Sequence, residues 1–533
     1  MDRGCRSYLA LSALLLAACG QAPPAGSLAV GTRYVLRAPD GSCPDEYQPH
    51  TPGAPPPGVT DVRLTVSGGG LAEPVSAKFA ATAERIAIEE LPAGNEYELK
   101  VEAISGLDVT WSGGATNIRV LSGRTTRVGL LLTRVGGLTC TAGAMLSARF
   151  LHTATLLPNG EVLLAGGFTA IGSSCGTGCV ELPATAEAEL FNPLTGEFKA
   201  AGTMRHARAL HAAVGLDDGR VLIVGGTGSG AEWADLAPFA EFYLDAQDEA
   251  LTTLEIWDPQ LNGGTGGFGS LQSISPGRLR ASAARLADGS ALVLGGLDLT
   301  QTGAARADAL LFDPDLPGGG GVVNSQLPLA AGNGRLAGTA TALPDGRALA
   351  WGGSAVADPF AETFEPGASP AQHGFSAFRA ADSRGLHLLL HTATMLPDGR
   401  ILVAGGITPD GTGYAGPDRQ YSRLVSLADA GRILDHTNGA PQLAVGRFAH
   451  SAASVAGDGV LLAGGYSAIS GDTLDSVEIW RTTADSDFHH DAALSEPRAF
   501  LTATPLADGT VLLAGGRRSA SGVSRAAEIY RAE

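Results

Sequence analysis

The sequence predicts an all-β protein, in which a seven-bladed β-propeller follows a small β-sandwich. Two observations predict the propeller. A Gly-Gly pair closes a β-rich run seven times between residues 136 and 533, and a Gly-containing turn divides each of these runs into two halves. The sandwich is predicted by short runs of alternating apolar and polar residues over 61–135.

The pattern of each copy predicts a β-hairpin, then a loop, then two further β-strands. Residues 149–167, RFLHTATLLPNGEVLLAGG, give the first hairpin, whose turn at Asn159-Gly160 supplies the positive φ angles of a tight turn. A third run follows, as in AELFNP at 188–193, and then a more degenerate fourth run. Four antiparallel strands repeated radially make a propeller. The first glycines of the seven pairs are Gly166, Gly225, Gly295, Gly352, Gly405, Gly464 and Gly515.

A hairpin, a Gly-Gly pair and a strand that ends in an aromatic residue and Asp-Pro resemble the kelch repeat. The resemblance covers residues 136–533 and implies a propeller of the galactose-oxidase-like type. Oxidases of that superfamily build a copper site from two tyrosines, two histidines and a cysteine crosslinked to one tyrosine. Beyond residue 146 this chain has Cys175 and Cys179 as its cysteines, and tyrosine is scarce at the repeated positions. We therefore expect a relative without that copper site, with no cofactor and no metal.

The seventh copy needs a strand from elsewhere, because the chain ends at Glu533 directly after its third run. The missing strand is predicted just ahead of the first copy. Ala142-Gly143-Ala144-Met145 before Arg149 matches Ala201-Gly202-Thr203-Met204 before Arg208. Residues 136–146 are thus expected to complete the last blade and to remove the open edges of the sheet.

Two positions of the repeat carry candidate functional residues. Four of the seven copies have a histidine at one repeated position (His152, His211, His391 and His450), and six of the seven have an arginine three residues before that position, copy five having Leu388 instead. The arginines could line a channel mouth and attract an anionic ligand; alternatively, each pairs with a blade glutamate or caps backbone carbonyls. The histidines are spread over four blades, which argues against a metal ring. The arginines are Arg149, Arg208, Arg278, Arg335, Arg447 and Arg498.

Long loops between the second and third strands should share a face with these arginines, and function concentrates on loops held by a rigid scaffold. The second copy has the longest such loop, 227–250, and the fifth has 407–421. Their aromatic residues complete the candidate binding face: Trp233, Phe242, Tyr243 and Tyr414. The acidic run Asp485–Asp491 could hold Ca²⁺, but the preferred interpretation is a solvated turn between blade strands.

The N-terminus reads as a lipoprotein signal peptide over residues 1–18. Arg3 and Arg6 precede a short apolar run that ends in Leu16-Ala17-Ala18-Cys19-Gly20, which resembles a bacterial lipobox with Cys19 as the lipidated residue. An ordinary secretory signal is the alternative. Gly20 in place of aspartate favours an outer-membrane lipoprotein by analogy. Residues 19–60 are rich in Pro and Gly and are expected to form a tether to the 61–135 spacer domain, which is similar to immunoglobulin-like or fibronectin-III-like modules.

Four further cysteines suggest disulfides in an exported chain. Three pairings are possible. Cys175–Cys179 is favoured because the pair brackets a short flexible loop, and it leaves Cys43–Cys140. Metal binding by Cys175 and Cys179 is the alternative.

Composition and motifs narrow the function. The net charge is −18 and the lysines are Lys78, Lys100 and Lys199, so nucleic-acid binding is not expected. No nucleophile triad, phosphate loop or zinc motif is present in the sequence. We expect a non-catalytic envelope protein that is held by its lipid anchor and presents the propeller to a protein or glycan. A carbohydrate-active or oxidative enzyme on the same fold, and a purely structural envelope role, are the alternatives.

Overall fold

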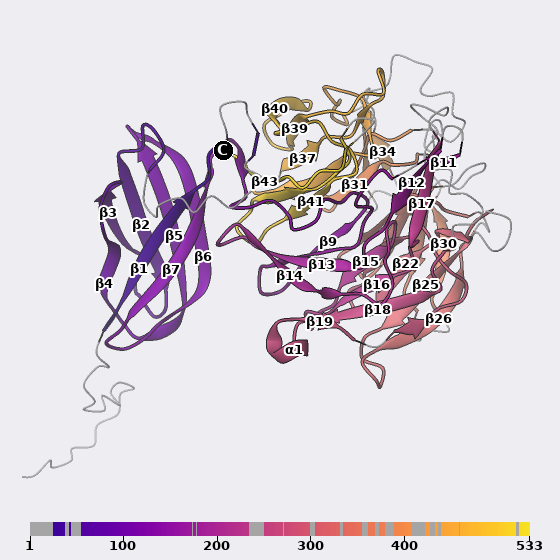
Figure 1. Cartoon of the computed structure of the whole chain (residues 1–533), viewed down its shortest axis with the longest axis horizontal. Coiled ribbons are helices and arrows are strands. Elements are labelled where there is room, and N and C mark those ends of the chain that lie inside the picture. Colours follow the sequence, from indigo (N-terminus) through magenta and orange to yellow (C-terminus); the bar gives the residue numbers. More distant parts are fainter. Residues whose placement is uncertain are drawn as a thin grey trace, which may run out of the picture.

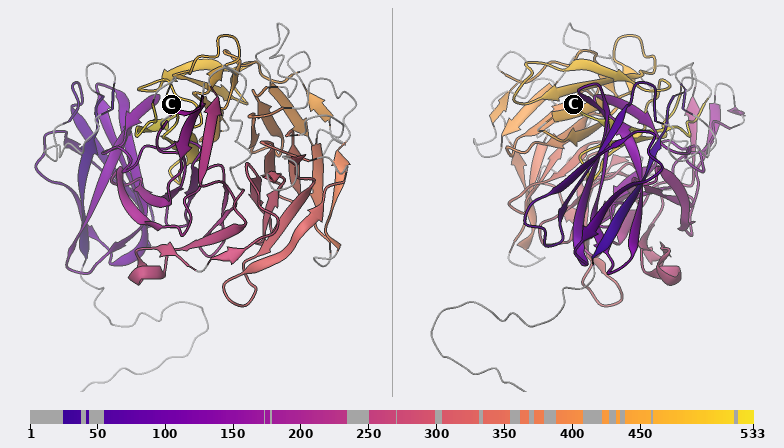
Figure 2. Two further views of the ribbon diagram at one scale, coloured as in Figure 1. Left: turned by 45° about the vertical axis from the view of Figure 1, so that its right-hand side comes forward. Right: turned by 90° about the vertical axis from the view of Figure 1, so that its left-hand side faces the viewer.

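The chain folds into two β parts that lie side by side, a sandwich and a propeller (Figures 1 and 2). The described part contains strands β1 to β43 and one short helix, α1 (Leu261–Gly264). The computed structural model describes residues 25–37, 42–43, 55–172, 174–176, 179–233, 250–269, 271–298, 304–330, 334–353, 361–367, 372–378, 388–407, 422–426, 432–434, 439–457, 459–518 and 522–533.

Seven strands form the sandwich, in the order β3-β2-β5-β6-β7-β1-β4. β6 and β7 pair at only two positions, Trp111↔Arg134 and Ser112↔Thr133. The sheet therefore folds over at this point, and its two halves enclose one apolar core, to which both contribute. The strands are β1 (Gly26–Tyr34), β2 (Asp61–Gly68), β3 (Val75–Ala80), β4 (Ile86–Leu91), β5 (Gly94–Ser105), β6 (Asp108–Val120) and β7 (Thr125–Arg134).

β1 corrects the expected boundary between tether and sandwich. Residues 26–34 fall in the span that we assigned to the tether, yet they pair with β4 and run parallel to β7. The physical reason is the alternation of Leu28, Val30 and Tyr34, whose side chains are buried while Gly31 faces outward. The Pro- and Gly-rich surroundings hide this short pattern in the sequence.

The propeller has seven four-stranded blades, as the sequence predicts, and each blade is an antiparallel sheet. The first four blades are contiguous in the chain. Blade 1 consists of β9 (Thr153–Leu156), β10 (Val162–Ala165), β13 (Glu187–Asn192) and β14 (Glu197–Thr203); blade 2 of β15 (Ala212–Gly215), β16 (Val221–Val224), β18 (Thr253–Asp258), and β19 (Gly267–Phe268) with β20 (Gln272–Ser273); blade 3 of β21 (Ser282–Arg285), β22 (Ala291–Leu294), β25 (Asp308–Asp313) and β26 (Gly321–Pro328); blade 4 of β27 (Thr339–Ala342), β28 (Ala348–Trp351), β29 (Ala361–Glu365) and β30 (Gly374–Phe378).

The last blade takes its fourth strand from the segment just ahead of blade 1. β8 pairs antiparallel with β43, with Thr139 opposite Ile529 and Leu138 opposite Tyr530. This is the position expected for the closing strand. Blade 5 consists of β31 (Thr392–Met395), β32 (Ile401–Ala404), β33 (Ser422–Ser426) and β34 (Arg432–Leu434); blade 6 of β36 (Ser451–Val455), β37 (Gly459–Ala463), β39 (Ser476–Arg481) and β40 (His489–Ala493); blade 7 of β41 (Thr502–Pro505), β42 (Val511–Ala514), β43 (Ala527–Arg531) and β8 (Gly137–Cys140).

Short strands also connect the loops of the propeller. β11 (Ser174–Gly176), β12 (Cys179–Pro183) and β17 (Ser229–Trp233) join the loops of blades 1 and 2 into one three-stranded sheet. The other two pairs are β23 (Leu297–Asp298) with β24 (Ala304–Ala305), and β35 (Arg447–Phe448) with β38 (Tyr466–Ser467).

The Gly-Gly pairs join neighbouring blades. The N–H of each second glycine donates to the carbonyl at the arginine position of the next blade, from Gly167 to Arg208 and so on round to Gly516 and Arg149, at 2.8–2.9 Å. The first glycine has a positive φ, and the blades approach so closely that a Cβ on Gly225 would lie 2.0 Å from the carbonyl oxygen of Arg278. Glycine is required there for both reasons.

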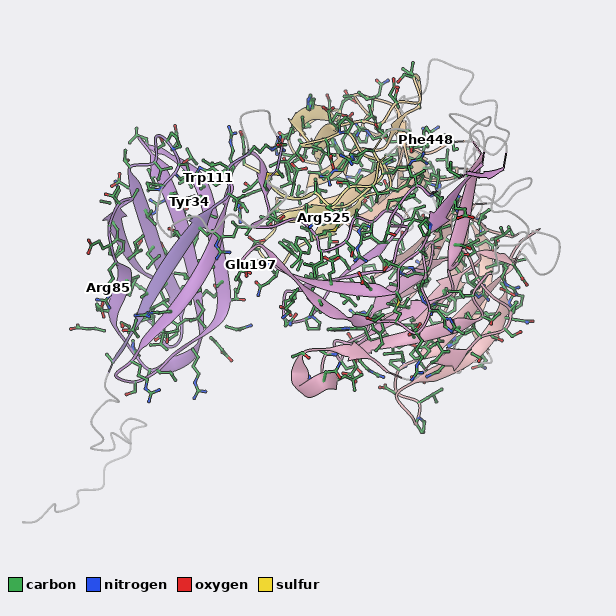
Figure 3. The ribbon with its side chains drawn as sticks, viewed as in Figure 1. Tyr34, Arg85, Trp111, Glu197, Phe448 and Arg525 are labelled. Atoms are coloured by element: carbon green, nitrogen blue, oxygen red, sulfur yellow. A yellow bond between two sulfur atoms is a disulfide. The ribbon has the colours of Figure 1, made fainter. Side chains whose placement is uncertain are left out.

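Sandwich and propeller meet at blades 1 and 7. Arg33 pairs with Glu197 at 2.7 Å, the N–H of Leu131 donates to Leu194 O, and Arg531 donates to Thr133 Oγ1. Figure 3 shows Tyr34 and Trp111 on the propeller side of the sandwich. The expected disulfide Cys43–Cys140 is confirmed, and it ties the segment after β1 to the closing strand.

Candidate functional site: the axial cavity

A closed ring of backbone hydrogen bonds surrounds the propeller axis. One residue per blade, directly before the histidine position, has a φ between 51° and 57°, in the left-handed region that non-glycine residues rarely adopt. The N–H of each donates to the carbonyl of the same residue in the preceding blade, at 2.9–3.4 Å, and the N–H of Leu151 completes the ring by donating to Phe500. The seven residues, which we call the axial ring, are Leu151, Leu210, Arg280, Ala337, Leu390, Ala449 and Phe500.

The six repeated arginines lie inside the blades and do not form a binding face. Each is buried, and its Nη1 donates to the carbonyl of the first glycine of its own blade. In five blades Nη2 meets the buried glutamate of the third strand, as in Arg208–Glu255 at 2.6 Å. The expectation that these arginines line a channel mouth was wrong, because the charge that would attract a ligand is already paired in the interior. The alternative of a glutamate pair fits the structure.

The glutamates also hold the segment that leads into each blade. Glu255 accepts the N–H of Arg205 and of His206, and Glu189 accepts those of Leu146 and Ser147. Each glutamate thus fastens the connection from the previous blade to its own third strand.

Blades 3 and 5 depart from this pattern. In blade 3 the position of the glutamate is Leu310, opposite Val293, and Arg278 pairs instead with Asp308 at 2.7 Å. Blade 5 has Leu388 at the arginine position and Arg423 at the glutamate position, opposite Val403. The arginine and the glutamate are therefore replaced together in blade 5, although the backbone links of that blade remain.

The four repeated histidines link neighbouring blades and are held neutral. The Nε2 of each lies 2.9–3.2 Å from a threonine hydroxyl of the preceding blade, such as His211 and Thr153. Burial lowers the pKa of His211 to about 3 and that of His391 to about 4. Burial also holds the pKa of His152 and His450 well below the usual value. A sequence gives no sign of this bond, because donor and acceptor come from different repeats.

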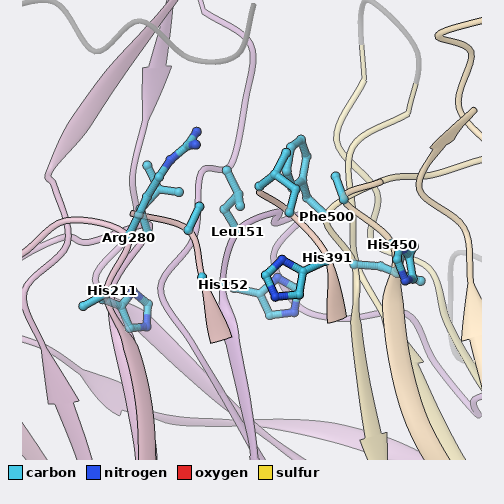
Figure 4. A pocket seen from close by; sticks show the side chains of 14 residues that line it. Leu151, His152, His211, Arg280, His391, His450 and Phe500 are labelled. Carbon is cyan, nitrogen blue, oxygen red and sulfur yellow. The ribbon is translucent and has the colours of Figure 1, made fainter. Parts of the chain in front are cut away.

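These rings surround an open cavity of about 270 Å³ on the axis. Side chains of the axial ring form one level of its wall, and the histidine position forms the next (Figure 4). The histidine position is small in blades 3 and 4, where Ala281 and Gly338 stand. The cavity lies at the end of the blades that carries the Gly-Gly pairs and the loops between second and third strands; we call this end the loop face.

Most of the predicted binding aromatics cannot be placed. Phe242, Tyr243 and Tyr414 lie outside the described residues, as does Cys19. Trp233 ends β17, and Cys175 and Cys179 belong to β11 and β12, but their side chains are outside what the structure describes. The predicted Cys175–Cys179 pairing therefore stays a prediction.

The acidic run after β39 does not converge on one point. Asp485 accepts the N–H of Arg481, Asp487 accepts that of Gln442, and Asp491 accepts the hydroxyl of Tyr530. No group of three His, Cys, Asp or Glu side chains that could hold a metal occurs among the residues that the structure describes.

Comparison with known proteins gives a fold relationship. No family model matches the chain, and no curated protein matches it. Among solved structures, the chain is similar to a fungal alcohol oxidase of the AA5 family in complex with copper, with 15% identity, a TM-score of 0.53, and coverage of 73% of this chain and 75% of that one. At this identity the likeness shows a shared β-propeller fold alone.

The axial cavity does not fit the copper centre of such oxidases. Its described lining has four histidines but neither tyrosine nor cysteine, and the histidines face threonines of neighbouring blades. We derive no chemistry through copper from these residues.

No helix of the described part is long and apolar enough to cross a membrane.

Proposed function

We propose that the protein is a kelch-type lipoprotein of the bacterial cell envelope, which binds a protein or glycan through the loop face and performs no catalysis. The observation that carries this proposal is that the repeated charged and polar side chains already bond to other parts of the propeller. The six arginines, five glutamates and four histidines at repeated positions are engaged within or between blades. They build a rigid disc and are not offered to a substrate.

The placement of the sandwich supports the choice of face. Its strands contact Leu194 and Glu197, beside the turn between the third and fourth strands of blade 1, and Arg531, at the end of the third strand of blade 7. Both places are at the end of the blades opposite to the loop face. A disc attached at one end leaves the other end, with its variable loops, directed toward a partner.

The lipid anchor in this proposal depends on the sequence around Cys19. Several acyl chains on one cysteine give stable membrane attachment, since each buried CH₂ contributes about 0.8 kcal/mol. A Gram-negative outer membrane is the proposed location. Detergent phase partitioning tests this: the native chain should enter the detergent phase, and a Cys19→Ala chain should stay in the aqueous phase.

The binding role is tested by affinity capture from an envelope fraction. Residues 234–249 are replaced by a Gly-Ser link of equal length, which keeps β17. The matched control replaces 315–319, between β25 and β26 at the opposite end of the blades. We expect the partner captured by the native chain to be lost with the first variant and kept with the second. Equal capture by both variants would contradict binding through this loop.

A further inference from the structure

A second pocket, of about 330 Å³, lies between the sandwich and the propeller. Ligand sites occur preferentially at such junctions between domains. The sandwich contributes residues from the segment after β1, from β6 and from the end of β7, and the propeller contributes residues of β8 and β40. The polar and aromatic side chains that line the pocket are Arg37, Trp111, Arg134, Thr139 and Asp491.

Arg134, the last residue of β7, brings a positive charge to this pocket. Its side chain is exposed, and no acidic group in the part of the chain that the structure describes pairs with it. Its backbone N–H donates to Thr139 Oγ1 at 2.7 Å, which fixes the residue against β8. An arginine side chain presents several N–H donors in a planar array that matches a carboxylate. The charge is therefore available to an anionic group in the pocket.

Arg37 lines the same pocket and has one donor without a partner. Its Nη2 donates to Ala493 O at 2.8 Å and to the carboxylate of Glu528, so its charge is paired. Its Nε is buried and has no hydrogen-bond partner among the described residues. Buried donors without a partner are uncommon in folded proteins. An oxygen atom of a bound molecule would satisfy this donor.

Asp491 places an acceptor on the propeller wall of the pocket. It is the extra residue of a β-bulge in β40, between His490 and Ala492. Blade 1 has the same bulge with Ala201 as the extra residue, so the backbone irregularity belongs to the repeat, whereas blade 6 adds a carboxylate to it. Bulges at sheet edges often direct a side chain into a functional site.

The carboxylate of Asp491 is held in place by Tyr530. One of its oxygens accepts the Tyr530 hydroxyl at 2.6 Å, and the other has no partner in the described part of the chain. Burial raises the pKa of Tyr530, so this hydroxyl stays protonated and donates. Asp491 therefore keeps one acceptor for a hydroxyl group of a ligand.

The size and the wall of the pocket limit the occupant further. A water molecule in the liquid takes up about 30 Å³, so a pocket of about 330 Å³ holds a molecule of roughly a dozen non-hydrogen atoms. Trp111, on the propeller side of the sandwich (Figure 3), and Leu36 give the pocket an apolar surface. A single ring with one carboxylate and several hydroxyl groups fits this size and this chemistry.

We propose that the pocket between sandwich and propeller binds a hexuronate, a six-carbon sugar acid. The carboxylate lies at Arg134, an oxygen of the sugar accepts from Arg37 Nε, and a hydroxyl group donates to Asp491. Trp111 and Leu36 cover the apolar face of the ring. This site is separate from the loop face and does not depend on the partner proposed above.

The test is titration of the purified full chain with D-glucuronate, followed by ligand-observed NMR, with D-glucose as the neutral sugar of the same ring size. Arg134→Gln removes the cation, and Asp491→Asn removes the carboxylate but keeps an acceptor for Tyr530. Arg127→Gln is the matched control, because Arg127 is an exposed arginine of the same strand, β7, that does not line the pocket.

We expect glucuronate to bind the native chain and the Arg127→Gln variant equally. Glucose, and glucuronate with Arg134→Gln, should bind at least about tenfold more weakly, because a hydrogen-bonded charge pair is lost. Asp491→Asn should also weaken glucuronate binding, since the amide turns a donor toward the sugar hydroxyl.

A β-linked glucuronate trimer identifies the source of the ligand: binding of the trimer supports the end of an acidic polysaccharide, and its exclusion supports the free sugar acid. Thermal unfolding of each variant checks that both domains are folded. The proposal is overturned if the native chain does not bind glucuronate, if glucose binds equally well, or if Arg134→Gln keeps the native affinity.

Discussion

Blades 2 and 7 have the same four-stranded plan, but the chain supplies their strands differently. Blade 2 is contiguous, whereas blade 7 combines β41 to β43 with β8, which comes from the other end of the propeller. Bringing distant segments together costs conformational entropy. Blade 7 has links that compensate for this cost: the disulfide Cys43–Cys140, the contact of Arg37 with Glu528, and the hydrogen bond from Arg525 to Met145 O. The comparison shows that the repeat is sufficient to define a blade, while closure of the ring involves additional covalent and polar links.

Removal of the repeated glutamate should give the largest effect, and a greater one in blade 7 than in blade 2. Glu255→Leu leaves Arg208 buried without its carboxylate and should lower the free energy of unfolding by about 3–5 kcal/mol. Glu528 accepts from both Arg498 and Arg37, so Glu528→Leu should cost about 1 kcal/mol more. Urea denaturation of the two variants measures this difference. If Glu528→Leu lowers the free energy of unfolding less than Glu255→Leu does, the Arg37 contact does not stabilise the closure.

Loss of the disulfide should come next in size. A Cys43→Ala/Cys140→Ala chain should be less stable by about 2–4 kcal/mol, because the cross-link closes a loop over a sequence separation of 97 residues. Amide hydrogen exchange, measured peptide by peptide, should show faster exchange in blade 7 and little change in blade 2. A uniform increase over all blades would argue that the disulfide supports the whole fold and not the closure.

The free energy of unfolding should also depend on pH, with a change per pH unit that is smaller than the two effects above. This dependence should come from the contiguous blades, which carry the histidines. His211 of blade 2 has a pKa of about 3 when folded, against about 6.5 when unfolded, whereas blade 7 has Leu501 at that position. The unfolded chain therefore binds the proton first, and stability is lost as the pH falls from about 6.5 toward 3. Each such histidine contributes up to about 1.4 kcal/mol per pH unit. His211→Gln should reduce the slope of unfolding free energy against pH between 6 and 4.5; an unchanged slope would contradict a neutral buried imidazole.

The sequence predicts the parts of this architecture that depend on local pattern. Gly-Gly pairs and Asp-Gly turns locate the hairpins, and the match between residues 142–145 and 201–204 locates the closing strand. Interactions between blades are not visible in this way, because their partners are some sixty residues apart and differ in type. The bond between His211 and Thr153 and the axial ring both belong to this class.

The arginines illustrate a second limit of sequence reasoning. A periodic arginine can serve a ligand or the fold, and only burial decides between them. Arg208 has no exposed side-chain surface, so its charge serves the fold. Arg280 interrupts a position of the axial ring that is otherwise apolar, and no motif in the sequence marks that position.

The central claim is that seven blades close into one ring through equivalent backbone bonds. Its most direct test is residue-resolved amide hydrogen exchange of the native chain at the second glycines of the pairs. Gly226 joins contiguous blades, while Gly516 donates to Arg149 across the closure. A closed ring predicts protection of the Gly516 amide within about tenfold of that at Gly226. An amide at Gly516 that exchanges as fast as an unfolded peptide, beside a protected Gly226, would contradict the account.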